Sequence, residues 1–264
     1  MDNTEERIIT NLDGRLHSYN NSNNTLFINN VESKKAIIFI NGLGGTLVSP
    51  NYLEKLNEMC KKLNIKLLVP QFDSHPAFQL KPIESDLTNL LELLDDQSQN
   101  LDEIVLMGHS TGCQVSLLFI EKFMNKKIKG VILQAPVSDV EGMEIDVKDL
   151  SEYLNKARNN KYVEFNDQIF LSERFLSLYE RNNKEDLFSS WTDDQRLIKI
   201  GKITKIISIV SEADKYCYVD VKHKLKLLGE VVTIKEAGHS IKDKEHQSIL
   251  VDHVKFFLEK LDLI

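Results

Sequence analysis

Cysteine is scarce in this chain of 264 residues, which contains only Cys60, Cys113 and Cys217. The three are far apart, odd in number and include no C-x-x-C pair, so we expect reduced thiols rather than a disulfide framework or a zinc site. The seven histidines show no metal-ligand spacing such as H-E-x-x-H. The sequence therefore predicts no metal, no cofactor and a cytoplasmic location.

The chain also lacks an excess of positive charge, a long apolar run and an apolar leader. Its 33 Lys and Arg against 40 Asp and Glu give a net charge of −7, which argues against nucleic acid and anionic membrane surfaces as partners. No stretch approaches about 18 uninterrupted apolar residues, the length of a membrane span. The start, M-D-N-T-E-E-R, is polar, so no signal peptide is visible. With 42% hydrophobic residues, we expect a single domain over 1–264 with a full core.

Short apolar, β-branched runs alternate with helical patterns along most of the chain. Before residue 35 there are two modest strand candidates, 7–10 and 25–27, which predict an antiparallel edge hairpin. The later strands are expected at 36–40, 66–70, 103–107, 130–134, 205–210 and 231–234, and the helices at 52–63, 87–94, 111–126, 219–228 and 245–260. Repeated β-α units predict an α/β fold with a mostly parallel central sheet flanked by helices.

The alternation stops for about sixty residues, at 140–199. This segment is charged and mostly helical in pattern, for example at 150–157 and 172–181, with Trp191 near its end. We interpret it as a helical cap, inserted after the sixth main strand, that covers the pocket and sets substrate choice. Packing decoration or a dimer surface is the alternative interpretation.

The stretch Met107–Cys113, M-G-H-S-T-G-C, is the feature around which the other patterns are arranged. An apolar run precedes it and a helical pattern follows. Gly-x-Ser-x-Gly at a strand-to-helix turn is the nucleophile elbow of α/β-hydrolases. Gly108 and Gly112 would remove Cβ atoms that collide where strand and helix pass close together. Ser110 would then stand at the apex with an exposed hydroxyl.

A serine nucleophile needs a base and an acid that orients the base, and in this fold their order along the chain is nucleophile, acid, base. That order is met by Ser110, by Asp214 in S-E-A-D and by His239 in E-A-G-H-S. Each follows a predicted strand, so all three are expected at one edge of the sheet. Asp220 and Asp243 are alternative acids, although Asp220 stands where a helix cap is expected.

The loop Asn41-Gly-Leu-Gly-Gly45 follows the third strand, where the second donor of an oxyanion hole is expected. The Leu43 N–H would act together with the Thr111 N–H on the substrate oxygen. A phosphate-binding loop is the alternative, but the Lys-Ser/Thr of a P-loop is missing.

Other candidates near these motifs have simpler explanations. His109 is expected to pack beside the nucleophile, and Cys113 to be a small buried thiol. His246 and His253 fall on the last helix, where surface or packing roles are more common.

The stretches Leu106–Gln114, L-M-G-H-S-T-G-C-Q, and Gln134–Asp139, Q-A-P-V-S-D, resemble a distinct branch of the α/β-hydrolases. This eukaryotic family includes fungal siderophore esterases that act on fusarinine-type esters. The resemblance covers most of the chain and implies the α/β-hydrolase fold and serine hydrolysis of an ester or related acyl bond. Residue by residue, it places the triad at Ser110, Asp214 and His239.

The chain departs from the family pattern at Val115, where an acidic residue is common, and after the triad acid, where it reads D-K-Y-C-Y. Many hydrolases also have His in place of Asn41. These departures leave every triad member present, but siderophore specificity does not follow from them.

The function expected is cleavage of a carboxylic ester of a small molecule through an acyl-enzyme intermediate. Two alternatives stay open: a thioesterase or lipase, which would use the same elbow, and a non-catalytic binding protein on the same scaffold.

Overall fold

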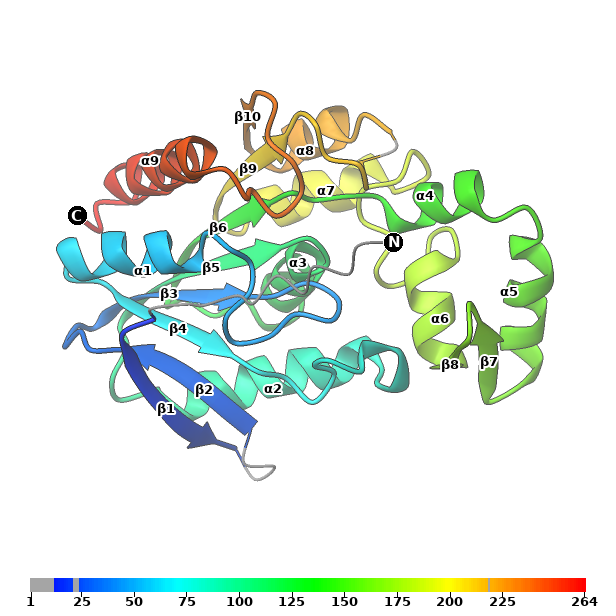
Figure 1. The fold of residues 1–264 in the computed structure, drawn as a ribbon, viewed down its shortest axis with the longest axis horizontal. Helices are drawn as coiled ribbons and strands as arrows, with labels where there is room; N and C mark the ends of the chain where they lie inside the picture. The colour runs from blue at the N-terminus through cyan, green and yellow to red at the C-terminus, as the bar shows by residue number, and fades with distance from the viewer. Residues whose placement is uncertain (1–11, 21–23, 218) are drawn as a thin grey trace, which may run out of the picture.

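The computed structural model describes residues 12–20, 24–217 and 219–264 and is built on an eight-stranded sheet (Figure 1). The strand order is β1-β2-β4-β3-β5-β6-β9-β10. The pairs β1–β2 and β2–β4 are antiparallel, and the remaining pairs are parallel. The strands are β1 (Gly14–Tyr19), β2 (Asn24–Asn29), β3 (Lys35–Ile40), β4 (Lys66–Pro70), β5 (Glu103–His109), β6 (Ile128–Gln134), β9 (Lys205–Ser211) and β10 (Glu230–Ile234). The predicted, mostly parallel sheet is therefore confirmed.

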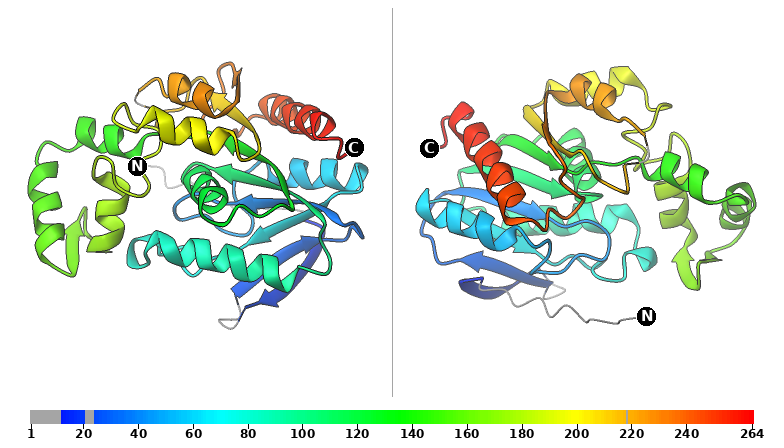
Figure 2. Two further views of the ribbon diagram at one scale, coloured as in Figure 1. Left: turned by 180° about the vertical axis from the view of Figure 1, so that it is seen from behind. Right: turned by 45° about the horizontal axis from the view of Figure 1, so that its top comes forward.

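Two layers of helices cover the sheet (Figures 1 and 2). On one face, α1 (Leu53–Lys62) and α9 (Lys244–Lys260) pack over one apolar cluster of strand residues. On the other face, α2 (Ile83–Asp96), α3 (Gly112–Phe123), α7 (Asp194–Gly201) and α8 (Lys222–Leu228) pack over a second cluster. Since both faces are covered, the central strands are mostly apolar, and residues 36–40 are all buried.

The N-terminal hairpin differs in part from the prediction. Strand candidate 25–27 lies within β2, as expected, while candidate 7–10 lies outside the described residues. The partner of β2 is β1, which was not predicted. Its sequence G-R-L-H-S-Y is mostly polar and five of its six residues are exposed, so no apolar pattern marks it. An edge strand of this kind is defined by its backbone pairing.

Between β6 and β9 the chain leaves the sheet and forms an insertion that all views show at one end of the sheet (Figures 1 and 2). The insertion contains α4 (Asp139–Asp146), α5 (Leu150–Asn159), β7 (Tyr162–Phe165), β8 (Gln168–Leu171) and α6 (Ser172–Tyr179). It has its own apolar cluster, which is rich in aromatic side chains: Leu150, Ala157, Val163, Phe165, Phe170, Phe175, Leu178 and Tyr179. The carboxyl ends of β3, β5 and β6 point toward this insertion (Figure 1).

The helical pattern expected for 140–199 omits a β-hairpin. Strands β7 and β8 pair antiparallel, joined by Asn166 and Asp167, both with positive φ (49° and 59°). Two consecutive positive φ angles are what a tight two-residue hairpin turn requires, and Asn and Asp tolerate them. The last helix of the segment, α7, packs with α8 and α3 beside the main sheet. The part that stands apart from the sheet is therefore formed by α4 to α6.

A buried arginine joins the insertion to the sheet layers. Arg174 on α6 is 1% exposed, and its guanidinium lies 3.3 Å from Asp86 Oδ2 on α2 and 3.1 Å from Glu185 Oε2. Burial raises the pKa of Asp86, an effect that the Arg174 charge opposes. Burial also raises the pKa of Glu185, to about 7. This buried polar cluster lies where α6 of the insertion meets α2.

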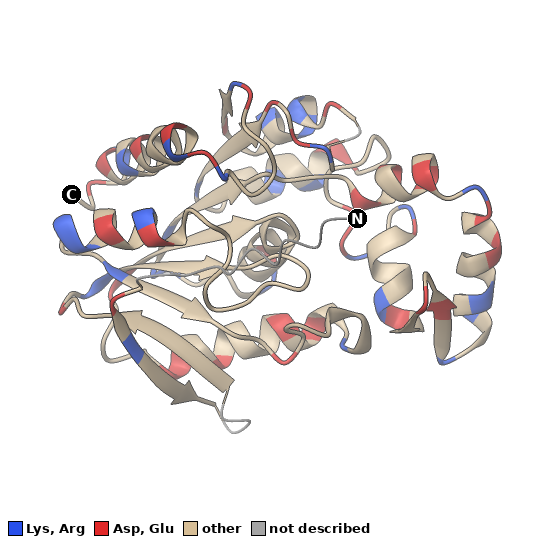
Figure 3. Ribbon diagram, viewed as in Figure 1, with Lys and Arg blue, Asp and Glu red and all other residues tan. Residues whose placement is uncertain are grey.

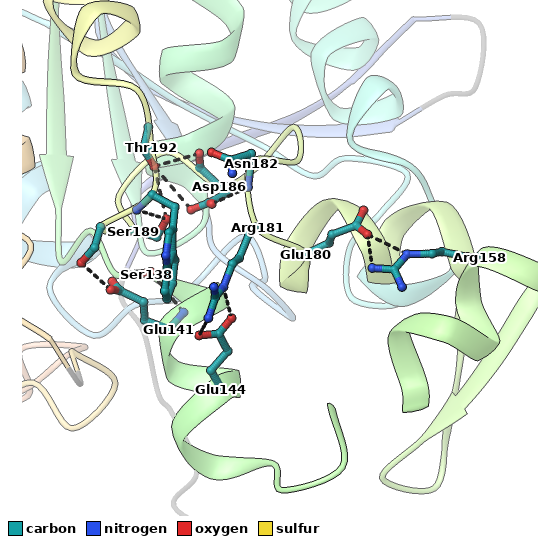
Figure 4. A network of polar contacts seen from close by, with 12 residues as sticks. Ser138, Glu141, Glu144, Arg158, Glu180, Arg181, Asn182, Asp186, Ser189 and Thr192 are labelled. Atoms are coloured by element: carbon teal, nitrogen blue, oxygen red, sulfur yellow. Dashed lines mark hydrogen bonds and ion pairs between the residues drawn. The ribbon is translucent and has the colours of Figure 1, made fainter. Parts of the chain in front are cut away.

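A second polar network ties the two ends of the insertion together (Figure 4). On α4, Glu144 accepts hydrogen bonds of 2.6 and 2.9 Å from Arg181, which follows α6. The Arg181 guanidinium lies 3.7 Å from the ring centroid of Trp191. Glu141, also on α4, accepts a hydrogen bond of 2.6 Å from Ser190. The outgoing and returning segments are thus held side by side.

Charged residues lie mainly on the helices and loops, and the central strands carry few (Figure 3). Among the described residues, no helix is both long enough and apolar enough to cross a membrane.

Candidate active site

The turn from β5 into α3 places Ser110 in a backbone conformation that residues other than glycine rarely adopt. Its φ is 54°, in the left-handed region. The Ser110 N–H donates a 3.0 Å hydrogen bond to the Gln134 carbonyl, and the Cys113 N–H donates one of 2.9 Å to the Ser110 carbonyl. A strained serine fixed between a strand and a helix is the arrangement of a nucleophile elbow.

The two glycines of the motif stand where backbone segments touch. A Cβ at Gly108 would lie 2.3 Å from the Gly112 carbonyl oxygen, across the turn. A Cβ at Gly112 would lie 2.2 Å from the Ile40 carbonyl oxygen, on the neighbouring strand β3. Because neither backbone atom can move like a side chain, only glycine fits at these two positions.

His239 and Asp214 lie together on the loops that follow β10 and β9. The His239 Nδ1 lies 2.6 Å from Asp214 Oδ2, and the two side chains are 12% and 2% exposed. Asp214 Oδ1 also accepts a 2.9 Å hydrogen bond from the Tyr216 N–H. The carboxylate is thus held from two sides, and it fixes the orientation of the imidazole ring. Ser110 and His239 both line the same cavity.

Other polar residues behind the base form a buried network. The Gln134 side-chain oxygen accepts a 2.8 Å hydrogen bond from the Tyr52 hydroxyl and lies 2.5 Å from His109 Nδ1. The Gln134 amide donates a 3.4 Å hydrogen bond to the His239 carbonyl. Burial lowers the pKa of His109 to about 4, helped by the nearby His239 ring at 4.9 Å between centroids. A neutral His109 therefore packs beside the elbow, as the sequence predicts.

The alternative acids are engaged elsewhere. Asp220 accepts a hydrogen bond of 2.9 Å from the Lys222 N–H at the start of α8. Asp243 is the N-cap of α9 and accepts from the backbone of Glu245 and His246. Asp243 therefore caps a helix and Asp220 binds the first backbone N–H of α8, whereas Asp214 faces the imidazole.

The remaining candidates named from the sequence also have positions in the structure. Cys113 is fully buried on α3, burial raises its pKa well above the ordinary value, and its thiol donates to the Gly108 carbonyl at 3.3 Å. His246 and His253 lie half-buried on α9, outside the set of residues that line the cavity.

The glycine-rich loop after β3 passes directly beside Ser110. A Cβ at Gly42 would lie 2.8 Å from the Cβ of Ser110. The loop is closed by a 3.0 Å hydrogen bond from the Gly45 N–H to the Gly42 carbonyl, and Gly44 has a φ of 68°. The described residues provide no hydrogen-bond acceptor for the N–H of Leu43 or Thr111. The two donors expected to form an oxyanion hole are thus both unused by the protein.

A cavity of about 670 Å³ opens over Ser110. Its walls come from the glycine loop, the elbow, the loop of His239, the start of α4 and the end of α6. From the insertion, Val137–Asp139, Gly142, Met143, Asp146 and Tyr179 line it. The volume is in the range of small-molecule sites.

Two motifs that are distant in sequence meet in this wall. Gln114 of the elbow helix donates a 2.9 Å hydrogen bond from Nε2 to Asp139 Oδ2, the last residue of Q-A-P-V-S-D. Asp139 lines the cavity and is half-buried, and burial raises its pKa to about 6.

Several residues of the site were not singled out from the sequence. Tyr216 packs edge-on against the His239 ring, with 4.9 Å between centroids, and Tyr52 donates its hydroxyl to Gln134. Nothing in the pattern around either tyrosine marks it. The motif Q-A-P-V-S-D did mark Gln134 and Asp139, but only as family features without a role.

Within the described residues, no group of three or more His, Cys, Asp or Glu side chains could hold a metal ion.

The parallel sheet, the elbow and the paired His239 and Asp214 define a protein of the α/β-hydrolase fold. Comparison with known families adds the particular one: over residues 5–259 the chain belongs to the family described as protein of unknown function (DUF1749).

Among curated proteins, the chain is similar to the fusarinine C esterase sidJ of Aspergillus fumigatus, with 26% identity over 162 residues. The alignment covers 50% of this chain and 46% of that relative, so it spans about half of each protein.

Solved structures share the fold at low sequence identity. A siderophore hydrolase, EstB from Aspergillus fumigatus, matches with a TM-score of 0.76 and 22% identity, over 95% of this chain and 98% of that one. Est1E from Butyrivibrio proteoclasticus matches with a TM-score of 0.68 and 15% identity, over 96% and 100% of the two chains.

Proposed function

We propose that this protein is a serine hydrolase that cleaves a carboxylic ester of a small molecule through an acyl-enzyme intermediate. The observation that carries the proposal is the 2.6 Å contact of His239 Nδ1 with the buried Asp214 Oδ2, because His239 lines the same cavity as Ser110 on its strained turn. A nucleophile, a base and an orienting acid from three separate loops are the parts that acyl transfer requires.

In the first step, His239 takes the proton of the Ser110 hydroxyl as its oxygen attacks the acyl carbonyl. Asp214 stabilises the imidazolium that forms. The N–H groups of Leu43 and Thr111 donate to the developing oxyanion, in line with their lack of any other acceptor among the described residues. The imidazolium then protonates the leaving alcohol, and a water activated by His239 releases the acid.

The insertion is proposed to act as a cap for this site. Residues from α4 and α6 line the cavity above Ser110, so a change in the insertion changes the shape that a substrate meets. The name of the relative, fusarinine C esterase, makes esters of that kind one class to include in a substrate panel.

We propose a cytoplasmic location because the cysteine thiols are free. Cys60 and Cys113 are buried and Cys217 is half-buried, and all three are free. Free thiols are typical of reducing compartments.

The test is hydrolysis of p-nitrophenyl and thioester substrates by the wild type, Ser110→Ala and Asp214→Asn. We expect wild-type ester turnover, and a loss in kcat/KM of at least about 10³-fold for each variant. Ser98→Ala, in the exposed turn that follows α2, is the matched control. Equal turnover by Ser110→Ala would contradict the proposal.

No turnover of any ester or thioester by the wild type would favour the second candidate, a binding protein on a hydrolase scaffold. Thioester turnover far above ester turnover would instead favour a thioesterase.

A further inference from the structure

The charged side chains that line the cavity differ in whether they have a partner of opposite charge. Two carboxylates of α4, Asp139 and Asp146, and one ammonium, Lys242, face the space above Ser110. Asp146 and Lys242 each have an interaction partner. The other titratable groups in the walls are His109, His239, Tyr179 and Tyr216.

Asp139 is the carboxylate in this wall that lacks a cationic partner. Its Oδ2 accepts from Gln114 Nε2, a neutral amide. No Lys, Arg or His nitrogen among the described residues lies within 4.0 Å of it. Arg174 and His239 act on Asp139 only through space, because the Arg174 guanidinium is directed at Asp86 and Glu185 and the His239 Nδ1 at Asp214.

A half-buried carboxylate without a cationic partner is poorly stabilised in its charged form. Partial burial disfavours the charged form, and one neutral hydrogen bond offsets this only in part. A positive charge entering the cavity would supply the missing partner. The ring of Tyr179 is in the same wall, and the face of an aromatic ring also attracts a cation.

We propose that Asp139 determines substrate specificity by binding a positively charged nitrogen, so that the cavity selects esters that carry an ammonium group over uncharged or anionic esters of the same shape. This rests on the proposed function, in which Ser110 is the nucleophile. Gln114 is the positioning residue, because it fixes the carboxylate from the elbow helix.

The test compares three p-nitrophenyl esters: that of γ-trimethylammoniobutyrate, that of its uncharged tert-butyl isostere, and that of glutarate. We expect wild-type kcat/KM to favour the ammonium ester over the isostere by roughly tenfold, the size of one partly screened ion pair. The glutarate ester should be the poorest substrate, since it brings a second negative charge to Asp139.

In Asp139→Asn, which keeps an oxygen for Gln114, the ratio of kcat/KM for the ammonium ester to that for the uncharged ester should fall to about one. Asp139→Glu keeps the charge and should keep part of the ratio. Asp149→Asn removes the same charge from an exposed position of the insertion and should leave the ratio unchanged.

The ratio should also fall as the pH is lowered through about 6, because the Asp139 carboxylate becomes protonated there.

A wild-type ratio near one, or a ratio that survives in Asp139→Asn, would overturn the inference while Ser110-dependent turnover left the proposed function standing. Failure of the wild type to hydrolyse any of the three esters would overturn both.

Discussion

The sheet and the insertion are held together by different kinds of interaction. The sheet packs aliphatic strand residues between two helical layers, and residues such as Ile38, Leu106 and Ile132 are fully buried. The insertion has a small aromatic cluster of its own. The ion pair of Arg174 with Asp86 connects it to α2, and the pair of Arg181 with Glu144 ties its two ends together.

The apolar packing of the sheet and the polar contacts of the insertion suit different roles. Apolar packing on both faces holds the elbow and the loops of Asp214 and His239 in fixed relative positions, which acyl transfer requires. A polar boundary depends on a few specific partners, so the insertion can change without disturbing the sheet. The cavity lies between these two regions, and residues of both line it. In the function proposed above, the sheet side supplies the reacting groups and the insertion the selectivity.

The largest effect on this comparison is expected from removal of the buried arginine. Arg174→Met leaves Asp86 and Glu185 without their cation, and breaking a buried pair in this way typically costs about 3–5 kcal/mol of unfolding free energy. Urea denaturation, with hydrogen exchange to locate the loss in α6, measures it.

The triple variant Arg174→Met, Asp86→Leu, Glu185→Leu is the control, because apolar replacement of the whole cluster should recover most of the loss. If Arg174→Met alone left stability and exchange unchanged, the boundary would not depend on this cluster.

The second effect concerns pH and the same cluster. The pKa of Glu185 is raised to about 7 from an ordinary 4.5, so between these values the folded state holds more protons than the unfolded state. Its contribution to stability therefore falls as the pH rises through this window, by about 1.4 kcal/mol for each pKa unit of difference.

Glu185→Gln removes this dependence. The stability of the wild type relative to the variant should therefore decrease from pH 4.5 to pH 7. The half-buried His75 and the buried His109, whose lowered pKa of about 4 acts in the opposite direction, are common to both proteins and cancel. A difference that is flat with pH would refute the assignment.

A third substitution disturbs the close packing of α3 against β3 at the elbow. Gly112→Ala places a Cβ 2.2 Å from the Ile40 carbonyl oxygen, and overpacking of this kind costs typically about 1–3 kcal/mol. Gly238→Ala is the matched control, since its added Cβ would meet nothing within 4 Å. Equal stabilities for the two alanine variants would show that the elbow is looser than described.

The smallest effect is expected at the exposed network of Figure 4. Arg181→Ala loses the Glu144 pair and the contact with Trp191, but the Arg181 side chain is 51% exposed and solvent screens such pairs. Thermal unfolding should show a much smaller shift than for Arg174→Met. A shift of equal size would mean that the exposed network, rather than the buried cluster, attaches the insertion.

The same contrast explains what could be predicted from the sequence. Strands buried on both faces leave continuous apolar runs, and Gly-x-Ser-x-Gly requires glycine for a steric reason, so the sheet and the elbow are visible in the residues. The order Ser110, Asp214, His239 follows from the fold's topology. These features depend on local chemistry.

The insertion is less visible because its order comes from distant partners. The β7–β8 hairpin carries its signal only in Asn166-Asp167, and the alternation around it is short. The pairing of Arg174 with Asp86 joins residues 88 positions apart, and Gln114 meets Asp139 across two motifs. The spacing of apolar residues along the sequence does not predict contacts between such distant residues.

The central claim is that Ser110 is a nucleophile activated by His239 and Asp214. The most direct measurement is reaction with a fluorophosphonate, followed by mass spectrometry of the peptides from the wild type and His239→Ala. We predict a single adduct on Ser110 in the wild type and a labelling rate lower by at least about 10³-fold without the imidazole. An adduct on another residue, or equal rates in the two proteins, would contradict it.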